Sequence, residues 1–451
     1  MNAELLRIER ELNSRRPEHA IVPTLERIAA LAALLGDPQR ACPVIHVTGT
    51  NGKTSTARMI ETLLRARGLR TGLYTSPHLS SMRERISIDS EPLSAEDFVA
   101  AYEDVAPYAA MVDGQQALRL SFFEMLTAMA FAAFANAPVD VAVVEVGLGG
   151  TWDATNIADG AVAVVTPVAL DHTAYLGDTV AAIATEKAGI IKPGAVAVLA
   201  RQSEAAAAAL ERRAAEVAVP VLSEGIDFAV TGRDLAVGGQ QLAISGLKGS
   251  YPDLLLPLFG AYQAQNSACA LAAAEAFSGA GPLGEDLVRS AFAAMTAPGR
   301  LEVVRRSPVV IVDSAHNPAG MAASAEAVTE AFSFGTLIAV LAVSADKDVP
   351  GMLEELEPAV SSVVVTRNAA ARSMDPGELE RLAAGVFGPD RVVAAPRLDD
   401  AIDIAAALAD EASGGLGGAG ILITGSTTTA GEARLLLRAA GTAGTTGELA
   451  P

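Results

Sequence analysis

Residues 44–55 read Val44-Ile45-His46-Val47-Thr48-Gly49-Thr50-Asn51-Gly52-Lys53-Thr54-Ser55 and carry the clearest structural signal in the chain. The β-branched run predicts a strand, the two glycines predict a tight turn, and a helical pattern then extends from Thr54 to Arg67. A strand, a glycine-rich turn and a helix in this order form a phosphate-binding loop. Backbone N–H groups and the positive end of the helix then face the anion.

Lys53 and Thr54 are the side chains that such a loop needs. The lysine would reach the β- and γ-phosphates of a nucleotide, and the threonine hydroxyl would bind Mg²⁺. The match to the general pattern is incomplete, because that pattern has glycine where this chain has Val47. An ordinary turn is the alternative interpretation, but the strand and helix on either side favour a nucleotide site.

Composition narrows the class of protein. At 451 residues the chain is long enough for two or three domains. Many alanines and valines, with few aromatic residues, are typical of an α/β protein. The formal net charge of −20 argues against a nucleic-acid partner. It also implies that an anionic substrate meets a locally positive pocket.

The sequence favours a cytoplasmic location. Cys42 and Cys269 cannot make a disulfide framework, which favours a reducing compartment. The N-terminus has no apolar run typical of a secretory signal. No apolar run reaches the roughly 18–20 residues that a membrane span needs, so the apolar helix near 125–134 is assigned to the core.

Strands and helices alternate in the first part of the chain. The valine-rich run 139–144 predicts a strand buried on both faces of a parallel sheet, and residues 83–88 predict an exposed strand. Residues 228–258 read as short antiparallel strands. Further strands are expected at 69–74, 162–166 and 195–199, and helices at 94–112, 121–135, 202–217, 260–277 and 283–295.

Pro298-Gly299-Arg300 predicts a break between two domains, after which strands and helices alternate again. We predict an α/β fold. Residues 1–297 form an ATP-binding domain with a mainly parallel sheet of the phosphate-loop type and helices on both faces. Residues 298–440 form a smaller Rossmann-like α/β domain, and residues 441–451 form a flexible tail. The strands expected in the smaller domain are 309–312, 337–343, 363–366, 392–395 and 421–424.

Polar clusters follow several predicted strands. Glu145 lies where its strand ends, and ligands gather at the carboxyl ends of parallel strands. It is therefore a candidate Mg²⁺ partner of the loop threonine, with an exposed loop acid as the alternative. His172 follows the next strand, and its position raises the chance of a functional role.

Several motifs occur in one order along the chain. Together they resemble the folylpolyglutamate synthase/dihydrofolate synthase family of the Mur-ligase superfamily, over about residues 20–435. The segments that carry the resemblance are Gly49–Thr54, Tyr74–Leu79, Glu145–Gly150, Asp153–Asn156, Asp171–Thr173, Glu186–Gly189, Pro298–Arg300 and Asp313–Pro318.

The resemblance implies four groups of site residues. Those that hold ATP, from both sides of an interdomain cleft, are Thr50, Asn51, Gly52, Lys53, Thr54, Asn266, Arg300, Asp313 and Lys347. The ligands of Mg²⁺, expected as two ions, are Thr54, Ser76, Glu145, His172 and Lys187, with Lys187 carrying a carbamate. The catalytic residues are Lys53, Lys187, Arg300 and His316. The pterin-binding residues are Phe122, Phe123, Trp152, Asp153 and Ala154.

The implied reaction is ATP-dependent amide ligation through an acyl phosphate. L-Glutamate would be joined to dihydropteroate, to the glutamate tail of reduced folates, or to both. The choice stays open because residues 18–23 differ from the bifunctional members of the family. The expected partners are these small molecules alone, and the expected state is a monomer with no membrane or nucleic-acid partner.

Two other functions are weighed against this one. A peptidoglycan Mur ligase carries a UDP-sugar domain before the loop, whereas only 46 residues precede Val47 here. A P-loop ATPase switch or a non-catalytic nucleotide-binding protein would make no amide. The cluster around Asp313 and His316 counts against a simple switch, which has no need of a second sheet.

Overall fold

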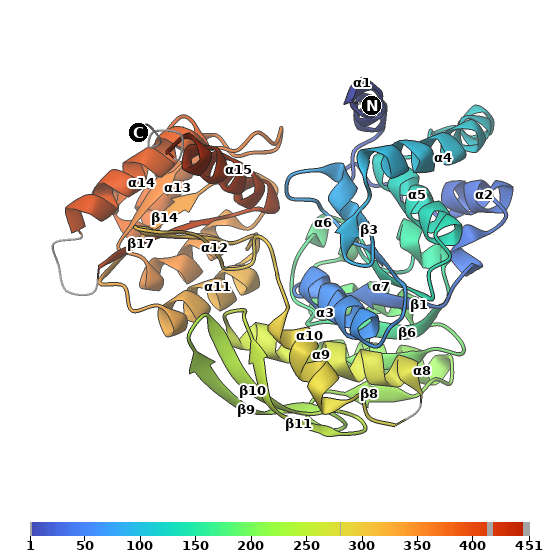
Figure 1. Cartoon of the computed structure of the whole chain (residues 1–451). Coiled ribbons are helices and arrows are strands. Elements are labelled where there is room, and N and C mark those ends of the chain that lie inside the picture. The colour runs from blue at the N-terminus through green and yellow to red at the C-terminus, as the bar shows by residue number, and fades with distance from the viewer. Residues whose placement is uncertain (1, 280, 413–417, 445–451) are drawn as a thin grey trace, which may run out of the picture. The chain divides into compact units, whose positions relative to one another are not determined.

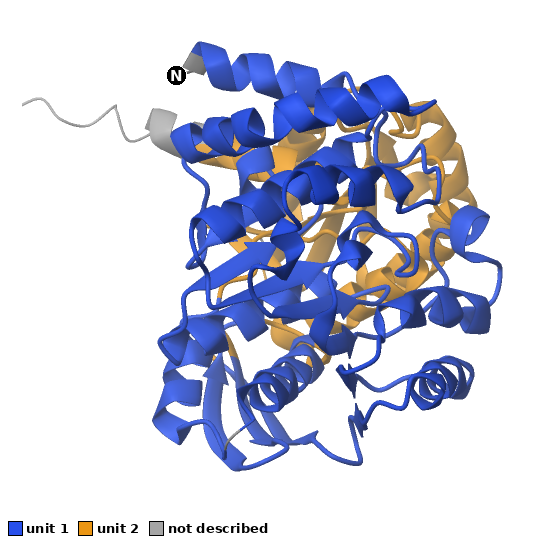
Figure 2. Ribbon diagram, turned by 90° about the vertical axis from the view of Figure 1, so that its right-hand side faces the viewer, with its two compact units in different colours: residues 1–236, 240–257, 263–295 blue, residues 237–239, 258–262, 296–451 orange. Residues whose placement is uncertain are grey.

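The computed structural model describes residues 2–279, 281–412 and 418–444 (Figure 1). Its contacts divide the chain into two compact units, shown in two colours in Figure 2. Unit 1 contains residues 1–236, 240–257 and 263–295, and unit 2 contains residues 237–239, 258–262 and 296–451. Each unit combines helices with a largely parallel sheet, so the predicted α/β fold is confirmed.

The main sheet of unit 1 places the predicted phosphate-loop strand near its centre. Its strands are β1 (Val44–Thr48), β2 (Thr71–Tyr74), β3 (Ile86–Ile88), β4 (Glu91–Pro92), β5 (Val141–Glu145), β6 (Gly160–Val165), β7 (Val196–Leu199) and β8 (Val221–Ser223). They are ordered β4-β3-β2-β5-β1-β6-β7-β8. β1 pairs in parallel with β5 and β6, while β3 and β4 form an antiparallel edge. The carboxyl ends of the central strands therefore share one edge.

Helices pack on this sheet. Those of unit 1 are α1 (Asn2–Asn13), α2 (Glu26–Leu34), α3 (Lys53–Ala66), α4 (Ala95–Gln115), α5 (Phe122–Asn136), α6 (Thr173–Leu176), α7 (Val180–Lys187), α8 (Glu204–Glu216), α9 (Ala261–Ser278, whose first two residues belong to unit 2) and α10 (Glu285–Ala293). Every residue of β5 is buried. Its alternate residues Ala142 and Val144 pack in a core with α4 and α5, and α3 packs on β1, β2 and β5.

Helix α5 is buried along almost its whole length, which confirms that this apolar stretch belongs to the core. Met125, Leu126 and Met129 are fully inaccessible to solvent. Burial of such a helix on several sides removes the need for a polar face. Among the described residues, no helix is both long and apolar enough to cross a membrane.

The prediction of an exposed strand at 83–88 was right only for a strand at residues 86–88, and that strand is mostly buried. The segment is a short 3₁₀ helix, η2 (Met82–Arg85), followed by β3. Ser81 and Glu84 cap that helix reciprocally, and this local motif competes with an extended backbone. Arg85 is only 3% exposed because it pairs with Glu18. A charged residue in this segment was therefore not evidence that the segment is exposed.

The remaining part of unit 1 is a small antiparallel sheet, as predicted for residues 228–258. Its strands are β9 (Ala229–Ala236), β10 (Gly239–Ser245) and β11 (Ser250–Leu256), ordered β11-β10-β9. Glu275 on α9 is fully buried and accepts hydrogen bonds from the hydroxyl of Tyr251 and the N–H of Leu247, each at 2.6 Å. These bonds join the helix to the sheet.

Unit 2 contains a second, largely parallel sheet. Its strands are β12 (Glu302–Arg306), β13 (Val309–Val312), β14 (Thr336–Leu341), β15 (Ser362–Val365), β16 (Val392–Ala394) and β17 (Ala419–Thr424), ordered β12-β13-β17-β14-β15-β16. The antiparallel edge strand β12 was not predicted, because its sequence is rich in charge. The parallel strands match the predicted set within two residues.

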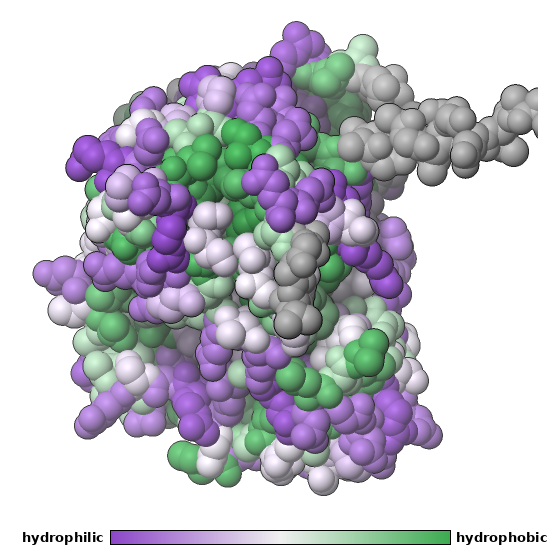
Figure 3. Space-filling model, turned by 90° about the vertical axis from the view of Figure 1, so that its left-hand side faces the viewer, coloured by the Kyte–Doolittle hydropathy of each residue, from purple (hydrophilic) through white to green (hydrophobic). Residues whose placement is uncertain are grey.

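The helices of unit 2 are α11 (Pro318–Ala331), α12 (Val349–Leu356), α13 (Pro376–Phe387), α14 (Leu398–Ala412) and α15 (Thr427–Gly444). Helix α15 extends into the predicted tail, and residues 445–451 of that tail lie outside the described residues. On the face seen in Figure 3, hydrophilic and apolar residues alternate in small groups.

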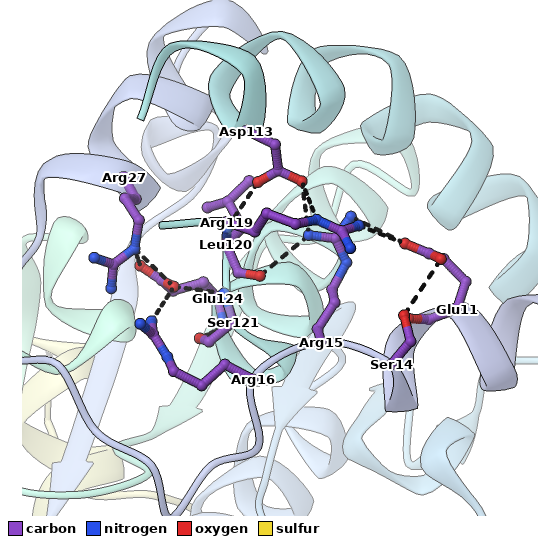
Figure 4. Close-up of polar contacts among 10 residues, drawn as sticks. All are labelled: Glu11, Ser14, Arg15, Arg16, Arg27, Asp113, Arg119, Leu120, Ser121 and Glu124. Atoms are coloured by element: carbon purple, nitrogen blue, oxygen red, sulfur yellow. Dashed lines mark hydrogen bonds and ion pairs between the residues drawn. The ribbon is translucent and has the colours of Figure 1, made fainter. Parts of the chain in front are cut away.

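A buried carboxylate joins the N-terminal segment of unit 1 to α5 (Figure 4). Oε1 of Glu124 accepts a hydrogen bond of 3.0 Å from Nε of Arg27, and Oε2 lies 3.6 Å from Nη2 of Arg16. Oε2 also accepts the N–H of Ser121 at 2.7 Å, which caps α5. Burial and the nearby charge of Arg27 lower the pKa of Arg16. Two guanidinium groups thus depend on one carboxylate.

We expect Glu124→Gln to lower the free energy of unfolding of unit 1 by about 3 kcal/mol, because it leaves two partly desolvated cations without their counter-ion. Urea titration of the intact chain, followed by circular dichroism, measures this. Glu96→Gln is the matched control, since Glu96 is an exposed acid in the first turn of α4. Equal midpoints for both variants would contradict the expected role of Glu124.

Candidate active site

The loop between β1 and α3 needs glycine at two positions. Gly49 has φ 145°, and a Cβ there would lie 1.9 Å from Oγ1 of Thr166. Gly52 has φ 87°, and a Cβ there would lie 2.5 Å from Oδ1 of Asn266. Left-handed backbone and such close approach exclude other residues without local rearrangement. Asn266, predicted to bind nucleotide, is thereby placed against the loop.

The loop is also held to the segment that follows β6. The N–H of Thr50 donates to the carbonyl of Pro167 at 3.0 Å, and the N–H of Asn51 reaches the same oxygen at 3.4 Å. The hydroxyl of Thr50 donates to the carbonyl of Ala169 at 3.0 Å. The structure therefore joins the loop to the segment that leads to His172.

Three of the predicted Mg²⁺ ligands lie together. The hydroxyl of Thr54 lies 2.8 Å and 3.0 Å from the two carboxylate oxygens of Glu145, to which it donates. The N–H of Ser76 donates to Oε2 of Glu145 at 3.2 Å. Glu145 is 1% exposed at the end of β5. A carboxylate beside two hydroxyl-bearing residues is a set of hard oxygen donors, which suits Mg²⁺.

Two lysines donate to one carbonyl oxygen. Nζ of Lys53 lies 3.2 Å, and Nζ of Lys187 lies 2.7 Å, from the carbonyl oxygen of Gly49. Lys187 is 3% exposed at the end of α7. Burial, together with the charge of Lys53, lowers the pKa of Lys187 to about 7. A substantial fraction of Lys187 is therefore an uncharged amine near neutral pH.

His172 is half-buried and immediately precedes α6 with a left-handed backbone, φ 51°. Its Nε2 lies 3.9 Å from Oδ1 of Asp171. Among the described residues, no group of three or more His, Cys, Asp or Glu side chains is placed to hold a metal ion. Of the predicted Mg²⁺ ligands, Glu145 and His172 are of these four residue types. The remaining predicted ligands are the hydroxyl groups of Thr54 and Ser76 and the side chain of Lys187.

The predicted pterin residues line the end of β5 and the start of α5. The ring of Phe123 contacts Gly147, where a Cβ would lie 2.5 Å from its Cζ, and it lies 5.9 Å from the ring of Tyr74. Trp152 packs on Gly149. Asp153 and Ala154 are buried and begin η3 (Ala154–Ile157). Phe122 and Phe123 begin α5, whereas Trp152, Asp153 and Ala154 lie in the loop after β5 and at the start of η3.

Arg85 was not identified from the sequence. Its guanidinium carbon lies 5.1 Å from the centre of the Phe122 ring, and its Nε donates to Nδ1 of His78 at 2.9 Å. Its Nη1 pairs with Glu18 in the segment 18–23. Burial and the charge of Arg85 lower the pKa of His78 to about 3, so the imidazole stays neutral and accepts.

The segment 18–23 is attached at a second point, where the carbonyl of His19 accepts a 2.7 Å hydrogen bond from the hydroxyl of Tyr175. Tyr175 lies in α6, three residues after His172. The pairing residues lie far apart in sequence, and only their fold brings them together. No local pattern could therefore have indicated them.

Unit 2 contributes its own group of predicted residues. The carboxylate of Asp313 accepts the N–H of Leu301 at 3.0 Å and the N–H of Ala315 at 2.8 Å. Asp313 thus fixes the backbone beside the half-buried Arg300. The carbonyl of Ser314 lies 3.0 Å from Nδ1 of His316, which must donate because a carbonyl only accepts. Nδ1 of His316 therefore carries a proton in this arrangement.

Lys347 follows β14 and is half-buried. Its N–H donates to the carbonyl of Ser344 at 3.2 Å, and the adjacent Asp348 caps α12. β13, β17 and β14 are neighbouring parallel strands. Asp313, His316 and Lys347 therefore follow strands that end at the same edge of the sheet.

Comparison with known proteins gives matches over nearly the whole chain. The Mur ligase middle domain matches residues 47–274, and the Mur ligase glutamate ligase domain matches residues 299–427. The dihydrofolate synthase/folylpolyglutamate synthase of Mycobacterium tuberculosis is 50% identical over 96% of this chain and 94% of that protein. The folylpolyglutamate synthase of Lacticaseibacillus casei is 38% identical over 75% of this chain and 79% of that protein.

The solved structures agree with the sequence matches. The Mycobacterium tuberculosis folylpolyglutamate synthase complexed with ADP superimposes with a TM-score of 0.93 at 50% identity. The match covers 96% of this chain and 98% of that one. The expected resemblance is confirmed, and the chain belongs to the folylpolyglutamate synthase/dihydrofolate synthase family.

Proposed function

We propose that this protein is an ATP-dependent ligase that joins L-glutamate through an amide bond to dihydropteroate, to the glutamate tail of reduced folates, or to both. The observation that carries the proposal is the group around the glycine loop of unit 1. There Thr54 contacts Glu145, and Lys53 and Lys187 share one carbonyl oxygen. Membership of the family supplies the substrate class.

The loop residues Thr50, Asn51 and Gly52 are proposed to hold the phosphates of ATP. Asn266, packed on Gly52, would bind the same nucleotide. Arg300, Asp313 and Lys347 of unit 2 are proposed as further nucleotide-binding residues, because the family resemblance assigns them this role. Positive charge at Lys53 and Arg300 suits a ligand that is itself anionic.

Mg²⁺, proposed as two ions, fits the oxygen donors of Thr54, Ser76 and Glu145, and we include His172 in the same ligand set. When bound, Mg²⁺ neutralises charge on the phosphates. Glu145 is a buried carboxylate at a strand end, beside the hydroxyl of Thr54. Burial of its negative charge is costly, and a bound cation would offset that cost.

We propose that Lys187 carries a carbamate. Its uncharged amine would attack the carbon of CO₂, so that a nitrogen–carbon bond forms and a proton is released. The product is an anion, which the neighbouring cation Lys53 would stabilise. The lowered pKa of Lys187 supports this chemistry, because only the neutral amine has the required lone pair.

The proposed ligation has two steps. A substrate carboxylate attacks the γ-phosphorus of ATP and forms an acyl phosphate. The bond between the γ-phosphorus and the bridging oxygen breaks, and ADP departs. The amine nitrogen of L-glutamate then attacks the acyl carbon, and phosphate leaves. Lys53 and Arg300 are proposed to stabilise the negative charge that builds up on oxygen. His316, whose ring is held by the carbonyl of Ser314, is proposed to take the proton that the amine releases.

Phe122, Phe123, Trp152, Asp153 and Ala154 are proposed to form the pterin site. The flat Phe122 and Phe123 rings offer stacking surfaces for a pteridine. We also propose a cytoplasmic protein, in keeping with the unpaired thiols of Cys42 and Cys269. The monomeric state stays a prediction.

The direct test is phosphate release from Mg·ATP with L-glutamate, measured separately with 7,8-dihydropteroate and with tetrahydrofolate. We expect a glutamylated product, identified by its mass, with at least one acceptor. Addition to both would identify a bifunctional enzyme. ATP turnover without any glutamyl product would overturn the proposal in favour of an ATPase.

We expect Lys187→Ala to reduce ligation nearly to background, because the variant cannot form the carbamate. Small carboxylic acids such as acetate should partly restore activity by supplying the missing anion. The measurement is the rate of glutamyl product with and without acetate, and Lys248→Ala serves as the matched lysine control. Lys248 is exposed, and its Nζ donates to the carbonyl of Gly279 instead. Unchanged activity in Lys187→Ala would remove this residue from the site.

The rate should also fall as the pH is lowered through about 7, where the amine of Lys187 becomes protonated and cannot hold CO₂. Added bicarbonate should partly offset the loss. The acetate-rescued Lys187→Ala enzyme should lack this step, since acetate stays ionised in that range. If the rate of both enzymes falls over the same pH range, the fall is due to the titration of a group other than Lys187.

A further inference from the structure

A chain of hydrogen bonds lies beneath the proposed pterin site. Nε2 of His46 is 2.8 Å from Oγ1 of Thr155, and that oxygen is 2.5 Å from Oδ1 of Asp153. His46 and Thr155 are fully buried, and Asp153 is 4% exposed. His46 belongs to β1, whereas the other two residues lie at the start of η3. The chain therefore joins the phosphate-loop strand to the substrate segment.

The direction of each hydrogen bond follows from the chemistry of the groups. Burial raises the pKa of Asp153 to about 6, so the carboxylate is mainly ionised at neutral pH and only accepts. The Thr155 hydroxyl donates its single proton to Asp153, and its oxygen must accept from N–H of His46. Burial and Lys192 lower the pKa of His46 to about 3. The ring is thus neutral, with its proton on Nε2.

The carboxylate of Asp153 is engaged by the backbone on both oxygens. Oδ1 also accepts the N–H of Thr155 at 3.0 Å, and Oδ2 accepts the N–H of Leu148 at 2.9 Å. The backbone of Gly147 also favours the ionised form of this carboxylate. A carboxylate offers about four acceptor positions, and the Thr155 hydroxyl, the Thr155 N–H and the Leu148 N–H take three of them.

The turn that Asp153 holds supports an aromatic side chain of the proposed pterin site. Gly147 is in contact with the ring of Phe123, and a Cβ at Gly147 would overlap that ring at 2.5 Å. A small shift of Gly147 would therefore move Phe123. The other end of η3 is fixed by Lys192, whose Nζ donates to the carbonyls of Asn156 and Ala158 at 2.6 Å and 2.9 Å.

We propose that His46, Thr155 and Asp153 are positioning residues that hold the 147–148 turn against Phe123 and so set the affinity for the pteridine-bearing acceptor. Asp153, which also belongs to the proposed pterin site, holds the turn through the hydrogen bonds that its carboxylate accepts. The inference rests on the proposed function for the identity of the acceptor. The hydrogen-bond chain itself is independent of it.

The test compares Thr155→Val, which removes the hydroxyl with little change of shape, with Thr155→Ser, which keeps it. We expect Thr155→Val to raise the KM for the acceptor about tenfold, because a buried carboxylate oxygen and the His46 N–H each lose a partner. The KM for ATP should change little, the lost partners should also lower the melting temperature, and Thr155→Ser should restore both the acceptor KM and the melting temperature. Thr231→Val, on exposed β9, is the matched control.

A second measurement tests the chain without catalysis. ¹⁵N spectra of histidine-labelled protein, with His46 assigned from His46→Gln, should show the Nε2–H tautomer and no titration between pH 5 and 8. An Nδ1–H tautomer, or an acceptor KM unchanged in Thr155→Val, would overturn the inference. If the wild-type protein makes no glutamyl product, the proposed function fails, and the tautomer still decides whether the chain exists.

Discussion

The lack of a side chain at Gly49 is the constraint on which the candidate site of unit 1 depends. A Cβ there would lie 1.9 Å from Thr166, so only glycine lets the loop approach the strand end so closely. This approach places the Gly49 carbonyl within 2.7 Å of Nζ of Lys187 and 3.2 Å of Nζ of Lys53. A displaced loop would separate these groups, because α7 and α3 are fixed by their own cores.

Charge at this loop is opposite to that of the whole protein. The chain carries a formal net charge of −20, yet the side-chain nitrogens of two lysines converge on one neutral carbonyl. Their mutual repulsion and the burial of Lys187 both disfavour its cationic form. An anionic ligand would relieve this repulsion, whereas the net negative charge of the whole chain would repel it. Binding therefore depends on short-range contacts rather than on long-range attraction.

Local patterns predicted those parts of the fold that local forces determine. The strand, turn and helix at residues 44–66 follow from β-branched residues, two glycines and helical spacing. The apolar run of α5 likewise identified a core helix. Arg85 shows where this reasoning fails. Its burial depends on Glu18, sixty-seven residues away in sequence, and no pattern near Arg85 contains that partner.

In the candidate site, too, the sequence predicted some contacts between residues but not all of them. Strand ends correctly indicated that Glu145 and Thr54 would meet, since parallel strands bring their carboxyl ends to one edge. Asp153 also follows a strand and a glycine-rich turn, and the family resemblance assigned it to the pterin site. Its carboxylate accepts hydrogen bonds from Thr155 and Leu148, so it also holds its own turn in place. An acid beside a substrate site can bind a ligand, fix the backbone around it, or do both. The hydrogen-bond donors around its oxygens show how far it fixes the backbone, and these donors are known only from the structure.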